Sequence, residues 1–196
     1  MLGGEQSGHI EAIGFELYTQ MLERAVREMK GEAAPDEAET QLNLGLNIRI
    51  PADYVPEENQ RLQMYKRVAR VETESQLADV TAELQDRFGP PPPAVRNLLD
   101  YASLKLLCMK VGINAIERKR DFVTLKFQQN ASVEPEQLAR FVSDQRGAQF
   151  TPDGVLKFVL KAAAAEEVLR ALRSVLEQLS SLEPASIVSS ASGPTP

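Results

Sequence analysis

The chain has 196 residues, 43% of them hydrophobic and 26% charged, which describes an ordinary globular protein able to bury one good core. Its formal net charge of −6 at pH 7 argues against an autonomous DNA-binding protein, because duplex DNA is bound mainly through Lys and Arg that neutralise phosphates. There is no signal peptide, no apolar run near the ~20 residues of a membrane span, and one cysteine, so we expect a cytoplasmic protein without membrane contact.

A glycine-rich loop opens the chain, with the sequence Leu2-Gly3-Gly4-Glu5-Gln6-Ser7-Gly8-His9-Ile10. The glycines permit positive φ and a close approach of the backbone to another surface or to a phosphate. Gly3 and Gly8 have the GxxxxG spacing of a P-loop, but His9 and Ile10 stand where that motif needs Lys and then Ser or Thr. The loop therefore cannot bind nucleotide as a P-loop does.

An amphipathic helix is predicted from Phe15 to Lys30, because apolar side chains recur there at helical spacing. Residues 31–40 are small, acidic and interrupted by Pro35, which is typical of a linker. Because an unsupported amphipathic helix is marginal in water, we expect this one to dock onto the following domain or onto another chain.

A strand is predicted at Leu42–Ile50, where every second residue is apolar, and we expect it to pair at the edge of a later sheet. Pro56 marks a position where a helix can begin. The inward face of that helix is expected to carry Leu62, Tyr65, Val68 and Ala69.

Two further helices are predicted before the chain turns to strands. Thr73 and Gln76 form a capping box for the first, which Gly89 ends. The prolines at 90–93 indicate a rigid connector, in preference to a polyproline ligand. Apolar residues nearly encircle the helix predicted at 94–111, which indicates the central helix of a bundle.

The remaining pattern predicts a ββαββα order. Its parts are a hairpin of 113–118 and 122–127, a helix over 135–145, strands near 148–150 and 155–160 joined by the turn 151–154, and a helix over 163–182. The fold class is therefore α+β: a helix, a helical bundle, and then a small mixed or antiparallel sheet with helices on one face.

Catalytic chemistry is scarce in this sequence. His9 is the only histidine, and no cluster of Cys, His and Asp with metal-ligand spacing accompanies it. Cys108 lies in an apolar helix and is interpreted as core packing. The basic runs at 66–70 and 118–120 are interpreted as solvated charges. We expect no active site, no metal and no cofactor in this chain.

The opening loop resembles the LLGxxQSGxI stretch of the translocation motif in bacterial transcription-repair coupling factors (the Mfd family), which RecG-type helicases share in looser form. The resemblance continues through Ile13-Gly14-Phe15-Glu16-Leu17-Tyr18 and later through Tyr54-Val55-Pro56, Tyr65-Lys66-Arg67 and Glu83–Gly89. It covers about residues 1–160. Gly4 departs from the family, in which an acidic residue is common at this position.

This resemblance implies a fragment of an ATP-dependent double-stranded-DNA translocase of the helicase superfamily, with ATP and Mg bound by motor domains upstream of Met1. Such proteins displace stalled RNA polymerase at DNA damage and recruit UvrA for nucleotide excision repair. Residues 1–30 would end the translocation motif and form a hook helix, 31–40 a linker, 41–183 a regulatory, autoinhibitory domain that packs on the UvrA-binding module, and 184–196 a disordered tail. The motif residues would be Leu2, Gly3, Gln6, Ser7, Gly8 and Ile10.

Two alternatives stay open. One is a free-standing acidic interaction module without a motor, which leaves the opening loop unexplained. The other is the tail of a RecG-like helicase, which shares the motif but not the domain after residue 40.

Overall fold

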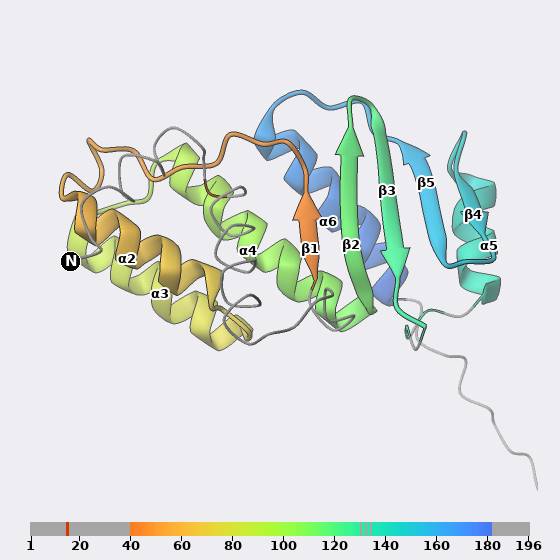
Figure 1. The fold of residues 1–196 in the computed structure, drawn as a ribbon, viewed down its shortest axis with the longest axis horizontal. Helices are drawn as coiled ribbons and strands as arrows, with labels where there is room; N and C mark the ends of the chain where they lie inside the picture. Colours follow the sequence, from red (N-terminus) through yellow and green to blue (C-terminus); the bar gives the residue numbers. More distant parts are fainter. Residues whose placement is uncertain (1–14, 16–39, 130, 132, 134, 182–196) are drawn as a thin grey trace, which may run out of the picture.

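A small sheet at one end of the molecule and a group of helices at the other are joined by one long helix (Figure 1). This computed structural model describes Phe15 and residues 40–129, 131, 133 and 135–181. The predicted glycine-rich loop, nearly all of the predicted helix at 15–30, the linker to residue 39 and the tail at 184–196 lie outside the described residues. Thr40, the last residue of the predicted linker, is described and is buried at the start of the sheet.

The sheet of the described region has five strands in the order β1-β2-β3-β5-β4. Its strands are β1 (Gln41–Asn43), β2 (Ile113–Lys119), β3 (Phe122–Phe127), β4 (Gln149–Thr151) and β5 (Val155–Val159). β1 lies at an edge and runs parallel to β2, while the other pairs are antiparallel. The predicted mixed sheet, its two hairpins and the edge position of the first strand are confirmed.

Five helices complete the described fold. They are α2 (Glu58–Ala69), α3 (Glu74–Phe88), α4 (Pro93–Val111), α5 (Pro135–Asp144) and α6 (Ala165–Ser181). α6 lies behind β2 and β3, and α5 lies beside β4 at the far edge (Figure 1). α4 packs on α6 and β2 at one end and on α2 and α3 at the other, so the predicted central helix is confirmed.

Turn and cap residues act as the sequence predicts. The Gln76 amide donates to Thr73 Oγ1 at 3.2 Å, and Gln76 Oε1 accepts from the Glu72 amide at 2.8 Å, one residue earlier than in a standard capping box. The Gly154 amide donates to the Thr151 carbonyl at 3.0 Å, which closes the predicted turn between β4 and β5. These local bonds fix where α3 starts and how β5 returns against β4.

The strand predicted at 42–50 is only partly formed. Alternate side chains are buried through Ile50, as predicted, but strand pairing ends at Asn43. Gly45 has φ +66°, a left-handed conformation that breaks the extended backbone. The chain therefore leaves the sheet and crosses to the helical end, where the buried face packs on helices instead of in a sheet (Figure 1). The alternation of apolar residues at 42–50 shows that one side of the segment is buried. An extended segment can be buried in this way without hydrogen-bonded pairing to another strand.

The inward face of α2 also differs from the prediction. Tyr65 and Val68 are buried as expected, but Leu62 and Ala69 are only half-buried against the core. Arg61 and Met64 are buried in addition. Arg61 Nη1 donates to the carbonyls of Val55 at 2.8 Å and Pro56 at 2.7 Å. The buried guanidinium thus satisfies loop carbonyls ahead of the helix, a use of Arg that hydrophobic spacing cannot reveal.

The hydroxyl of Thr40 holds the start of the edge strand. It is 2% exposed, and its Oγ1 donates to the Ile113 carbonyl at 3.0 Å. We expect Thr40→Val to lower the free energy of unfolding by about 1–2 kcal/mol, because a buried carbonyl loses its partner while the shape is kept. Urea denaturation measures this effect. Thr124→Val in β3 is the matched control, and an equal loss in both variants would contradict the assigned bond.

Candidate functional surfaces

The residues predicted for the translocation motif are not among those that the structure describes. Leu2, Gly3, Gln6, Ser7, Gly8 and Ile10 all lie outside it, as does His9. Their role stays a prediction. The described surfaces are therefore the ones on which a site can be built from geometry.

No reactive cluster stands out among the described residues. No group of three or more His, Cys, Asp or Glu side chains is placed to hold a metal ion in this part of the chain. Cys108 is buried in α4, and burial raises the pKa of its thiol, so the sulfur stays protonated and unreactive. Among the same residues, no helix is both long enough and apolar enough to cross a membrane.

An aromatic cluster joins Phe15 to the domain that begins 25 residues later. The Phe15 ring is 2% exposed; it stacks on Tyr65 at 5.5 Å between ring centroids and meets Tyr101 edge-on at 5.8 Å. The Phe15 amide donates to the Ile48 carbonyl at 2.9 Å. The sequence predicts Phe15 only as the start of a helix. We expected the predicted helix to dock onto the following domain or onto another chain; Phe15, its first residue, contacts the following domain, and residues 16–30 lie outside the described residues.

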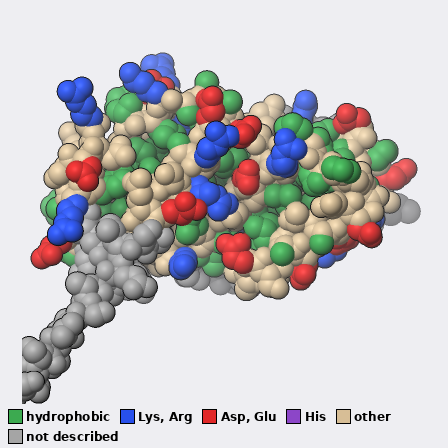
Figure 2. Space-filling model, turned by 180° about the vertical axis from the view of Figure 1, so that it is seen from behind, with side chains coloured by type: hydrophobic (Ala, Val, Ile, Leu, Met, Phe, Trp, Pro, Cys, Tyr) green, Lys and Arg blue, Asp and Glu red, His purple; other side chains and the backbone are tan. Residues whose placement is uncertain are grey.

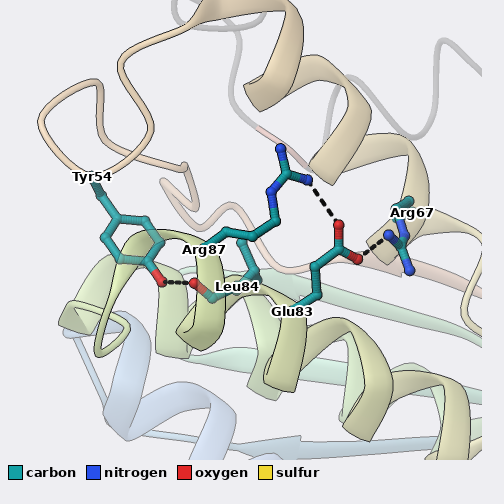
Figure 3. Close-up of polar contacts among 5 residues, drawn as sticks. All are labelled: Tyr54, Arg67, Glu83, Leu84 and Arg87. Atoms are coloured by element: carbon teal, nitrogen blue, oxygen red, sulfur yellow. Dashed lines mark hydrogen bonds and ion pairs between the residues drawn. The ribbon is translucent and has the colours of Figure 1, made fainter.

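Charged side chains link α2 to α3 on the surface of the helical end. Glu83 accepts from Arg87 one turn later at 2.8 Å and from Arg67 of α2, as drawn in Figure 3. Arg87 also lies over the Phe88 ring, 5.0 Å from its centroid. The basic run at 66–70 is therefore paired in part with α3, in agreement with its interpretation as a set of solvated surface charges.

The Tyr54 hydroxyl closes the end of α3. It donates toward the carbonyls of Gly89 at 2.8 Å and Leu84 at 3.0 Å, and Figure 3 shows it reaching over from the loop before α2. Burial raises the pKa of this phenol. The neutral, hydrogen-donating form is thus the one that the fold favours.

The sheet face turned away from α6 carries a mixed set of side chains. The strand alternation places Phe122, Thr124 and Lys126 of β3 there, with Phe122 63% exposed. Cross-strand pairing puts Lys119 beside Phe122 and Lys157 beside Thr124. The side chain of Lys119 pairs with Glu117 at 3.4 Å, so this face is not uniformly basic.

The opposite side of the molecule shows acidic and basic side chains interleaved with apolar ones (Figure 2). No large area of one sign is visible over the described residues in that view. Such a surface offers many modest polar contacts, and it lacks the basic stripe that nucleic-acid binding by charge alone requires.

We expect Tyr54→Phe to lower the free energy of unfolding by about 1 kcal/mol near neutral pH, because the carbonyls of Leu84 and Gly89 lose the one hydroxyl hydrogen that they share. Since burial raises the pKa of Tyr54, its contribution is present below the usual phenol pKa of about 10 and is lost as the pH rises above it. Denaturation at pH 7.5 and pH 11 measures both effects. A difference between variant and wild type that persists at pH 11 would contradict the donor role.

Comparison with known proteins matches this region to one family. The TRCF domain model matches residues 44–138. The transcription-repair-coupling factor of Escherichia coli K12 is 33% identical over 186 residues, covering 91% of this chain and 16% of that protein. That of Staphylococcus haemolyticus is 40% identical over 121 residues, covering 61% of this chain and 10% of the relative.

A solved structure has the same fold. The crystal structure of the C-terminal domain of transcription-repair coupling factor superposes with a TM-score of 0.60 at 23% identity, covering 74% of this chain and 96% of that one. The chain spans only 10–16% of the length of the curated relatives it matches. Fold, domain match and sequence identity agree, and the chain belongs to the transcription-repair coupling factor family, in the region that contains the TRCF domain.

Proposed function

We propose that this chain is the regulatory end of a DNA translocase that displaces stalled RNA polymerase at lesions and recruits UvrA. The observation that carries the proposal is the 33% identity to a transcription-repair-coupling factor across 91% of the chain. In this proposal residues 41–183 restrain the motor by packing on its UvrA-binding module. ATP and Mg are bound by motor domains that precede this segment in the full-length translocase.

The described surface suits reversible packing. Acidic and basic side chains alternate over the face seen in Figure 2, and the hydrophobic core is buried beneath the surface. No group of three or more metal-ligating side chains is present among the described residues. Contacts between domains of one chain are typically modest and polar, which lets them release. To hold about 99% of the molecules in a restrained state, the contact must favour that state by about 2.7 kcal/mol. A few hydrogen bonds and ion pairs can supply that amount.

The opening loop has a separate role in this proposal. Gln6 couples ATP hydrolysis to movement along DNA, while Leu2, Gly3, Ser7, Gly8 and Ile10 shape the loop around it. Support comes from the sequence resemblance of this stretch to the translocation motif. A free-standing module without a motor would have no use for such a loop.

Deletion of residues 41–196 tests the restraint in the full-length protein that contains this chain. We expect basal ATPase to rise about 100-fold, because the contact that is removed favours the restrained state by about 2.7 kcal/mol, and we expect UvrA binding to become measurable. Steady-state ATPase and a UvrA pull-down measure the two effects. Unchanged values for both would remove the regulatory assignment. The double variant Arg67→Ala/Arg87→Ala is a control for general loosening of the α2–α3 surface.

Replacement of Gln6 tests the loop in the same full-length protein. We expect Gln6→Ala to abolish displacement of a stalled polymerase while ATP binding stays within about twofold of wild type, because nucleotide is held elsewhere. The matched control is Gln63→Ala, at an exposed position of α2. Normal polymerase displacement by Gln6→Ala would contradict the motif assignment.

A further inference from the structure

Phe15 packs in the core of the domain formed by residues 40–181, although it precedes that domain in the sequence by 25 residues. The family match begins at residue 44, yet the Phe15 side chain is as buried as the core residues of α2 and α4. It contacts two rings and a backbone carbonyl, as described above. A phenylalanine held on this many sides is a specific contact, since packed rings gain about 0.5–1.5 kcal/mol beyond the burial of their area.

The socket that receives Phe15 is itself fixed by hydrogen bonds. Tyr65 Oη accepts from the Ile50 amide at 2.5 Å, and the Tyr101 hydroxyl donates to the Leu42 carbonyl at 2.8 Å. Both rings, which come from α2 and α4, are thereby tied to the segment at 42–50. We call Ile48, Tyr65 and Tyr101 the Phe15 socket.

Phe15 lies much closer in sequence to the predicted motif than the rest of the domain does. Four residues, 11–14, separate it from Ile10, the last residue of the predicted motif, whereas 29 residues separate Ile10 from Thr40. At about 3.5 Å per residue, the first connection reaches at most roughly 17 Å and the second roughly 105 Å. The contact at Phe15 therefore decides whether the domain is close to the loop or on a long tether.

We propose that the Phe15 socket is the docking site for the segment that bears the translocation motif, and that this contact sets the distance between motif and domain. The meaning of the motif rests on the function proposed above. For flexible tethers, local concentration falls roughly as the −3/2 power of length, so loss of the contact lowers the local concentration of the domain near the loop roughly 15-fold. Phe15 is then a positioning residue for the restraint by residues 41–183.

Distance measurement by pulsed electron spin resonance tests the docking in the full 196-residue chain. Spin labels go on His9→Cys and on Asp79→Cys, an exposed position of α3. The buried, protonated thiol of Cys108 does not compete for the label. We expect one narrow distance distribution in the wild-type background and a broad one in Phe15→Ala. Phe122→Ala, which removes an exposed ring, is the matched control and keeps the narrow distribution.

Three outcomes overturn the inference. They are a broad distribution in the wild-type background, a narrow one that survives Phe15→Ala, and a narrow one that disappears on dilution with excess unlabelled chain, which would mean that Phe15 comes from a second copy. Phe15→Leu keeps most of the buried volume and is expected to retain the narrow distribution. It keeps the test decisive if Phe15→Ala, expected to lower Tm by about 5–15 °C, fails to fold.

The same variant in the full-length protein separates this inference from the proposed function. We expect Phe15→Ala to raise basal ATPase toward the value of the 41–196 deletion. If the distance broadens while ATPase stays unchanged in both variants, docking stands and the regulatory function fails. If the deletion raises ATPase but Phe15→Ala changes neither distance nor rate, the regulatory function stands and the role of Phe15 falls.

Discussion

The packing of α4 against elements at both ends of the molecule is the contact on which the rest depends. One end of the helix lies on α6 and β2, and the other on α2 and α3. Its side chains are buried on several sides, from Val95 to Val111. The sheet end and the helical end are each too small to bury a sufficient hydrophobic core, and through α4 they share a single one. The surfaces at the sheet end and the helical end keep fixed relative positions because this helix is common to both.

The segment from Leu44 to Ile50 is the second link between the two ends. It follows β1, turns at the left-handed Gly45 and carries alternate apolar side chains across to the helices. Its carbonyl at Ile48 receives the Phe15 amide, and its amide at Ile50 donates to Tyr65. A stretch that looks like an ordinary strand in sequence thus forms part of the socket for an upstream residue. A regular ladder over the same residues would have placed these groups in the sheet.

Local sequence signals predicted most of the fold, and they failed where tertiary contacts decide. Caps and turns at Thr73, Gly89 and Gly154 need only neighbouring residues, so they were predictable. The end of β1 at Asn43 was not, because it depends on a left-handed Gly45 and on where β2 offers a partner. The burial of Arg61 depends on two loop carbonyls that come close only in the folded chain. The Phe15 socket has no sequence signal, since its three residues lie 17 to 53 positions apart in the chain.

The brevity of the outermost strands limits how this sheet can meet other proteins. β1 and β4 each have three residues, and they form the two borders of the sheet. Counted over the residues that the structure describes, a border of that length gives an added strand only a few positions to pair with, which disfavours stacking of one molecule on the next. Binding of a partner by strand addition is thereby disfavoured. A partner has to contact side chains on the open face of the sheet or on the helices.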